Sequence, residues 1–346
     1  MTAMSNQAPG APAGPVATQI GHEPPAAAVG VATQQEVDAA RGPLDALRGA
    51  VARVYLGPAR TIDLLLLTIL GRGHALLEGV PGVAKTTLVK AFASALGCSV
   101  RRVQFTPDLL PSDITGTYVL SPKDGTFNLR PGPIFANVVL ADEINRAPAK
   151  TQAALLEAMQ ERQVTIEGDR FELPPPFIVL ATQNPIDLEG TYPLPEAQID
   201  RFLLHVPMTY PSPREEVEML KTHGNASPHV AAQLDPQRVA ALQALTPRIH
   251  IEDDILDYIV AVCTFTRKHP RVVLGASPRA SLALATTARG IALLKGRTFV
   301  TPDDVRDVAS ATLAHRLILV PELEGDAKAR AGVIDEGISR VPYRRG

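Results

Sequence analysis

The stretch GVPGVAKTT at residues 79–87 decides the fold of this 346-residue chain. It follows a short apolar segment at 74–77 and precedes a helical pattern at 86–96, so a strand, a glycine-rich loop and a helix are predicted in that order. Loop amides and the amino end of a helix together favour bound phosphate. The predicted phosphate-binding residues are Gly79, Val80, Pro81, Gly82, Val83, Ala84, Lys85, Thr86 and Thr87.

Three residues of this loop have separate expected roles. Lys85 would reach the β- and γ-phosphates, and the Thr86 hydroxyl would ligate Mg²⁺. Ala84 stands where such loops usually have glycine. Because alanine lacks the access of glycine to positive φ, we expect a right-handed backbone at Ala84. The alternative interpretation of the stretch is an ordinary glycine-rich turn.

An apolar strand at 138–141 leads directly into two acids, Asp142 and Glu143. Asp142 would hold Mg²⁺, usually through water, and Glu143 would polarise the attacking water as general base. Many buried strands end in a surface acid, so the pair alone is a weak signal. The phosphate loop upstream makes a role in nucleotide chemistry the favoured interpretation. An enzyme that transfers phosphate to a small molecule would not need Glu143, whereas an ATPase that activates water would.

Three further polar residues are candidates for the same chemistry. Asn184 ends the fourth predicted strand, where its amide would orient water or touch the γ-phosphate, although Asn-Pro alone is a turn signal. Arg201 precedes the fifth strand, and Arg279 lies in the first turn of a later helix, where a cation opposes the helix dipole. Either arginine would stabilise charge on a transferring phosphate. Taken alone, both would be interpreted as solvated surface charges.

The order of elements predicts an α/β core followed by a helical domain. We expect a disordered tail at 1–35, rich in alanine, proline and glycine, a core at 36–211, a linker at 212–230, a helical domain at 231–320 and a frayed tail at 321–346. Turn signals predict two hairpins inside the core, at 118–129 and 164–173. Asp235, Ser277 and Thr301 each precede proline and predict helix starts.

Composition excludes several classes of protein. The net charge of −2 and the 4% aromatic content disfavour a general nucleic-acid binder. Two cysteines and scattered histidines disfavour a disulfide framework or a zinc centre, and they fit a reducing, cytoplasmic compartment. No apolar run is long enough to cross a bilayer, and the amino-terminal segment lacks the pattern of a secretory signal.

In combination, these motifs resemble the MoxR family of AAA+ ATPases. The resemblance covers about residues 51–319 and rests on four strings: GHALLEGVPGVAKTTLVKAFA, RPGPIFANVVLADEINRAPAKTQAALLEAMQERQVTIEG, VLATQNPIDLEGTYPLPEAQIDRF and GASPRA. It implies a parallel five-stranded sheet of order 5-1-4-3-2 with a helical lid. It also implies that the segment at Gly57-Pro58, where many members have Gly-Gln, helps to form the adenine pocket.

The resemblance assigns a role to each candidate. Lys85 and Thr86 would be Walker A, Asp142 and Glu143 Walker B, and Asn184 sensor 1. Arg201 would be the finger acting on a neighbour's nucleotide, with Arg146 as a second candidate, and Arg279 would be sensor 2, acting in cis or in trans. Ala84 is normal for the loop of this family.

The implied function is an ATP- and Mg²⁺-dependent, chaperone-like remodeller that forms a hexamer. Such proteins mature enzyme complexes or insert metal cofactors, often with a partner that carries a von Willebrand factor A domain, and lid rotation would move inserts against the client. Two alternatives stay open. Arg162 and Arg170 beside the second hairpin motivate a nucleic-acid motor, and a nucleotide-gated scaffold would bind ATP with scarcely any hydrolysis.

Overall fold

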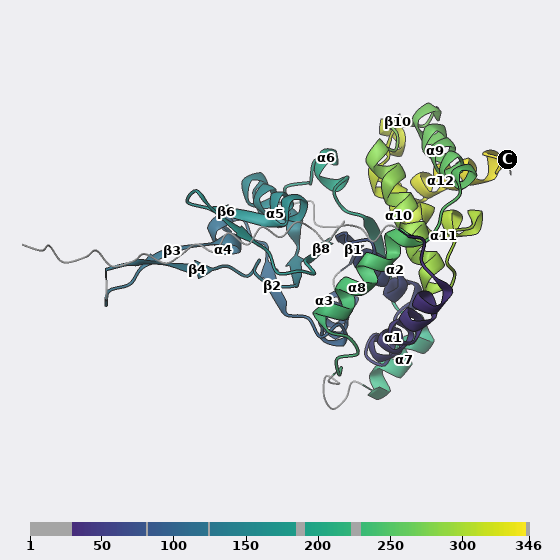
Figure 1. Ribbon diagram of the computed structural model, residues 1–346. Coiled ribbons are helices and arrows are strands. Elements are labelled where there is room, and N and C mark those ends of the chain that lie inside the picture. Colours follow the sequence, from purple (N-terminus) through teal and green to yellow (C-terminus); the bar gives the residue numbers. More distant parts are fainter. Residues whose placement is uncertain (1–29, 81, 124, 185–190, 223–229, 344–346) are drawn as a thin grey trace, which may run out of the picture. The chain divides into compact units, whose positions relative to one another are not determined.

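The central feature is a parallel five-stranded sheet. A computed structural model describes residues 30–80, 82–123, 125–184, 191–222 and 230–343 (Figure 1). The sheet order is β2-β5-β8-β1-β9, which is 5-1-4-3-2 when its strands are renumbered along the chain and counted from β9, so the predicted order is confirmed. The strands are β1 (Ala75–Gly79), β2 (Val100–Gln104), β5 (Val138–Asp142), β8 (Ile178–Gln183) and β9 (Leu204–Met208).

Seven helices in the described part of the chain belong to this first half. They are α1 (Gln34–Ala52), α2 (Ala59–Leu70), α3 (Lys85–Ala95), α4 (Pro111–Thr115), α5 (Ala149–Glu161), α6 (Glu196–Ile199) and α7 (Pro213–Thr222). Helix α1 begins with a capping box in which Thr33 and Glu36 bond each other's backbone amides. Residues 1–29, which hold most of the predicted tail, lie outside the described ranges.

Both predicted hairpins are present. The first pairs β3 (Gly116–Leu120) with β4 (Phe127–Pro131), and the second pairs β6 (Gln163–Ile166) with β7 (Asp169–Glu172). The Tyr118 hydroxyl of β3 donates to Asp169 Oδ2 of β7 at 2.6 Å, so a side-chain hydrogen bond joins the two hairpins.

The second half of the chain is mainly helical. It contains α8 (Pro236–Leu245), α9 (Asp253–Lys268), α10 (Pro278–Leu294), α11 (Pro302–Leu313) and α12 (Ala327–Arg340). Asp235, Ser277 and Thr301 cap α8, α10 and α11 with proline at the first position, as predicted. A short antiparallel pair, β10 (Val272–Leu274) with β11 (Ile318–Leu319), is an addition that the sequence pattern does not reveal.

Two segments differ from the expectation. The predicted tail at 321–346 contains the 14-residue helix α12, which buries Val333 and Ile334, and the predicted linker at 212–230 contains α7. The apolar pattern of α12 is thin, because only one narrow stripe of the helix packs against its neighbours.

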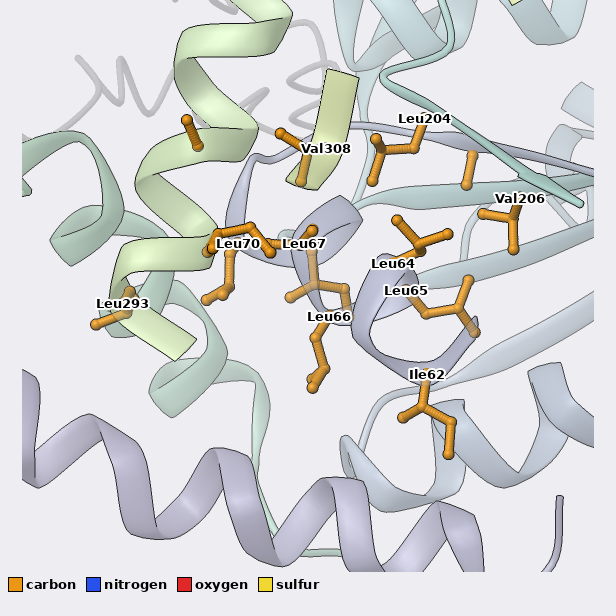
Figure 2. Packing of buried hydrophobic residues seen from close by; sticks show 14 of the residues in the cluster. Ile62, Leu64, Leu65, Leu66, Leu67, Leu70, Leu204, Val206, Leu293 and Val308 are labelled. Atoms are coloured by element: carbon orange, nitrogen blue, oxygen red, sulfur yellow. The ribbon is translucent and has the colours of Figure 1, made fainter. Parts of the chain in front are cut away.

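Helix α2 occupies the centre of the larger hydrophobic cluster (Figure 2). Its residues 64–67 are all buried, as expected of a helix surrounded by protein on every side. In Figure 2 its leucines lie between Leu204 and Val206 of β9 and the side chains of Leu293 and Val308 from α10 and α11. Within the described ranges, none of the helices combines the length and apolar character needed to cross a bilayer.

Candidate functional site

The predicted phosphate loop connects β1 to α3. Gly79 ends β1 beside β9, and a Cβ there would lie 2.4 Å from the carbonyl oxygen of Met208, so this close approach requires glycine. Lys85 begins α3, and its Nζ donates to the Gly79 carbonyl at 2.7 Å across the loop. Pro81 lies outside the described residues. The loop therefore has the strand–loop–helix context that phosphate binding requires.

The prediction of a right-handed backbone at Ala84 is wrong. Ala84 has φ +58° and ψ +26°, a left-handed conformation, and Gly82 has φ +86°. The preference of alanine for negative φ costs on the order of 1 kcal/mol and is overridden here by the turn that leads into α3. Five non-glycine residues of the described chain have positive φ, and two of them, Ala84 and Glu143, belong to the predicted site.

The two acids lie at the carboxyl end of β5, next to β8. The Thr182 hydroxyl of β8 donates to Asp142 Oδ1 at 2.6 Å and accepts the Glu143 backbone N–H at 2.9 Å. Arg102 of β2 bonds Asp142 Oδ2 from the other side, through Nε at 3.0 Å and Nη2 at 2.6 Å. Asp142 is buried, so these charge-assisted bonds fix its carboxylate.

The Glu143 carboxylate extends toward solvent and is held by two side chains. Gln104 Nε2 of β2 donates to Glu143 Oε2 at 2.9 Å, and Arg146 Nε lies 3.1 Å from the same oxygen. Gln104 Oε1 in turn accepts from Arg102 Nη2 at 2.7 Å. Both acids are thus linked through one polar network on the edge strand β2.

Lys85 lies within electrostatic range of both acids. Burial lowers the pKa of Lys85, and the negative charges of Asp142, Glu143 and Glu78 oppose that shift. Asn184 follows β8, which lies between β1 and β5, and its side chain is buried. Because parallel strands end at the same edge, the sheet brings Lys85, both acids and Asn184 to the same side.

The donor chemistry fits magnesium. The Asp142 carboxylate and the Thr86 hydroxyl are oxygen ligands, and Mg²⁺ commonly takes one or two protein ligands and completes its shell with phosphate and water. Within the described chain, no group of three or more histidines, cysteines or acids is arranged to hold a metal by itself. An ion at this edge would therefore depend on bound phosphate.

A cavity of about 330 Å³ lies between the loop that joins α1 to α2 and the start of α7. Tyr55, Gly57, Arg214 and Glu215 contribute to its wall, and burial raises the pKa of the Tyr55 hydroxyl. The segment at Gly57-Pro58 thus borders a cavity of a size that suits a small aromatic ligand.

Comparisons with known proteins agree with this geometry. Residues 74–204 match the model of the "ATPase family associated with various cellular activities (AAA)", and residues 264–336 match that of the AAA lid domain. The chain is 46% identical to the uncharacterized protein YeaC of Bacillus subtilis, over 85% of this chain and 93% of YeaC. It is 42% identical to the chaperone MoxR1 of Mycobacterium tuberculosis, over 95% of this chain and 88% of that protein. The chain belongs to the MoxR family of AAA+ ATPases.

A solved structure supports the same assignment. The crystal structure of a proposed ATPase from Cytophaga hutchinsonii is 37% identical and superposes with a TM-score of 0.83, over 90% of this chain and 98% of the other. Residues 264–336, which include α10 and α11, are accordingly the lid of a MoxR-family ATPase, and the protein is a chaperone-like AAA+ ATPase that hydrolyses ATP.

The two predicted arginines of this MoxR-family chain do not join the phosphate loop. Arg201 precedes β9 and Arg279 begins α10, and both line a second cavity, of about 270 Å³, together with residues that precede β1. In the parallel register Ala75 of β1 pairs with Leu204 of β9, so this cavity lies at the amino-terminal edge of these strands. The structure therefore separates the predicted site into two groups at opposite edges of the sheet.

Three residues of the site are absent from the sequence-based prediction: Thr182, Arg102 and Gln104. Thr182 belongs to a quoted string but gave no separate signal. Arg102 and Gln104 are two residues apart and therefore share one face of β2 near its carboxyl end. That shared face is the only sign in the sequence that they belong to the site. About 40 residues of the chain separate Arg102 and Gln104 from the two acids. Their contacts with the acids arise because the sheet order places β2 beside β5.

Proposed function

We propose that this protein couples ATP hydrolysis to the remodelling of protein clients, and that it thereby matures or activates protein complexes, including those that receive a metal or cofactor. The observation that carries the proposal is the cluster at the carboxyl edge of the sheet, where Thr182 holds Asp142 and Glu143 beside Lys85. The family supports a chaperone-like ATPase, and one relative, MoxR1 of Mycobacterium tuberculosis, is named a chaperone.

The chemistry divides among a few side chains. Lys85 and the amides of α3 would hold the phosphate chain, and Asp142 with Thr86 would hold Mg²⁺, which neutralises phosphate charge when bound. Glu143 would accept a proton from the attacking water once its carboxylate is released from Gln104 and Arg146. Asn184 would orient that water, and the cavity beside Tyr55 would receive the adenine base.

We also propose that the active form is a ring of copies, with a hexamer as the expected size, and that Arg201 and Arg279 act on a neighbour's nucleotide. Their place at the edge opposite to Lys85 supports action in trans. A protein with a von Willebrand factor A domain is the proposed partner, and the two free cysteines favour a reducing, cytoplasmic compartment.

The decisive experiment replaces the proposed base. Glu143→Gln should lower steady-state ATP turnover by at least about 10²-fold, because the water loses its proton acceptor, while ATP affinity stays within a few-fold of wild type. Turnover is followed by phosphate release and affinity by a fluorescent ATP analogue. The same variant should retain clients during purification, and turnover at the wild-type rate would refute the proposal.

A further inference from the structure

The cavity at the amino-terminal edge of β1 and β9 has an unusual charge composition. Its wall is formed by α10 and the short turn at Ala314–Arg316, and by three core segments: the residues before β1, the end of α5 and the residues before β9. Side chains of a single carboxylate, Asp200, and of five arginines line it; the arginines are Arg72, Arg162, Arg201, Arg279 and Arg316.

The one carboxylate is already engaged. Arg316 Nη1 lies 3.4 Å from Asp200 Oδ1, and the Ser277 hydroxyl bonds the same carboxylate at 3.2–3.3 Å. Burial lowers the pKa of Arg316 to about 10, and the Asp200 charge opposes that shift. The other four arginines form no ion pair with any residue of the described chain. The cavity therefore holds a clear excess of positive charge.

His74 in the cavity wall adds no charge to it. Its Nε2 donates to the Met159 carbonyl at 2.9 Å, and its Nδ1 accepts the Val179 backbone N–H at 2.9 Å. Burial lowers the pKa of His74 to about 4, so the ring is neutral at physiological pH and cannot offset the arginines.

Arg162 is held in this cavity by the backbone. It follows the last residue of α5 with φ +54°, and its Nη2 donates to the Arg72 carbonyl at 2.8 Å. Arg162 is exposed at the surface, although partial loss of solvent and the charge of Arg72 both lower its pKa. A guanidinium that is held in this way and forms no ion pair with a carboxylate is available to bind an anion from outside the protomer.

The protomer's own nucleotide cannot be that anion. The phosphate loop follows Gly79 at the carboxyl end of β1, whereas Arg72 and the cavity precede Ala75 at its amino end. Five residues of strand separate the two places by roughly 13 Å of extended backbone, before any loop is counted. A phosphate that meets these arginines would therefore come from outside the protomer.

We propose that Arg162 contacts the phosphate chain of a nucleotide bound by a second copy of this protein, as a third cation beside Arg201 and Arg279. The inference rests on the proposed function, since it requires nucleotide at the subunit interface. A second copy is the source because the proposed function already places Arg201 and Arg279, which line the same cavity, on a neighbour's nucleotide.

Mixing two impaired variants tests the proposal. An Arg162→Gln subunit keeps its own Lys85 and Glu143, and a Glu143→Gln subunit keeps its arginines. Each preparation alone should turn ATP over at least about tenfold more slowly than wild type. In a mixture, the first subunit hydrolyses ATP with Arg162 supplied by the second, so the rate should exceed the sum of the separate rates several-fold.

Matched variants separate the outcomes. Arg170→Gln, in the exposed hairpin strand β7 outside this cavity, should keep wild-type turnover. Arg201→Ala mixed with Glu143→Gln should recover activity as the positive control. Two outcomes would overturn the role of Arg162 and leave the proposed function standing. One is recovery in the Arg201→Ala mixture with no recovery in the Arg162→Gln mixture, and the other is wild-type turnover of Arg162→Gln alone.

Folding and assembly are checked in the same preparations. Circular dichroism, sedimentation and affinity for a fluorescent ATP analogue should match wild type for Arg162→Gln. Should that variant fail to assemble, Arg162→Lys keeps the charge without the planar fork; it should show reduced turnover and the same recovery on mixing. Absence of recovery from an assembled Arg162→Lys would equally overturn the inference. Wild-type turnover of Glu143→Gln would instead refute the proposed function itself.

Discussion

At the scale of single residues, the site depends on one hydroxyl that bonds both acids. Thr182 is fully buried, and its Oγ1 uses its donor on Asp142 and an acceptor lone pair on the Glu143 amide. A side chain without a hydroxyl would leave a buried carboxylate oxygen and a backbone N–H without this partner. The position of both acids therefore depends on a residue that is not among the predicted phosphate-binding residues.

Thr182→Val tests this dependence with little change of shape. Loss of both hydrogen bonds should cost about 1–3 kcal/mol of unfolding free energy and lower kcat at least about tenfold. Urea denaturation and steady-state kinetics measure the two effects, and Thr182→Ser should restore most of both. A Val variant with normal kcat would show that Asp142 and Glu143 are held adequately without the hydroxyl.

The sequence predicted residues more reliably than their backbone geometry. Lys85, Asp142 and Glu143 were found because each directly adjoins a strand or helix with a clear apolar pattern. The left-handed conformations of Ala84 and Glu143 were not predicted, because the local preference of these residues disfavours them and only the surrounding fold stabilises them.

At the scale of elements, the lid helix α11 depends on a charged cap. Asp304 is fully buried: it bonds the Thr301 N–H at 2.8 Å, and its other oxygen contacts Arg297 at 2.6 Å and Lys295 at 3.2 Å. Burial tends to raise the pKa of Asp304, but the bonds from Arg297 and Thr301 outweigh it, so the pKa is lowered.

Asp304→Asn should destabilise the lid by about 3 kcal/mol at pH 7, because it leaves two cations without their buried partner. A lowered carboxyl pKa stabilises the fold above the unfolded value, about pH 3.9, and that stability is lost as the pH falls through the folded value. The difference in unfolding free energy between the variant and wild type should therefore become smaller as the pH falls from 7 through 4 toward 3. Denaturant titrations follow it, and a constant difference would contradict the role of charge.

Elements were predictable in proportion to their apolar signal. The sheet strands, both hairpins and the proline-capped helices appear where the pattern and turn residues place them. Strands β10 and β11 were missed because three and two residues are too short to show alternation. Helix α12 was taken for a tail because its buried residues are Val333, Ile334 and Gly337, which give too short an apolar stripe.

At the scale of the whole molecule, the predicted site residues occupy two edges of one sheet. The sequence lists Lys85 and Arg279 as parts of one site but carries no information about which protomer's phosphate each one meets. The parallel register of β1 and β9, a contact between segments far apart in the chain, places the two residues at opposite edges and so supports the proposal that they meet different phosphates.

The variant Arg279→Ala distinguishes action of Arg279 on its own protomer's nucleotide from action on a neighbour's nucleotide. In dilute protein, where protomers are separated, the variant should bind a fluorescent ATP analogue within about twofold of wild type, while Lys85→Ala should lose binding. In concentrated protein its turnover should fall at least about tenfold, because the neighbour's phosphate loses a cation. Weakened binding in separated protomers would place Arg279 on its own nucleotide. For wild type, activity per protomer should rise with protein concentration.

The burial of α2 has a mechanical consequence. This helix packs against β9 on one side and against α10 on the other, so the sheet and the lid share one continuous apolar interior. A swing of the lid within one protomer would have to open voids there, and each ångström cubed of void costs about 24 cal/mol. In the proposed ring, the work released by hydrolysis is therefore more readily expressed as sliding of one protomer past the next than as the lid rotation expected from the sequence.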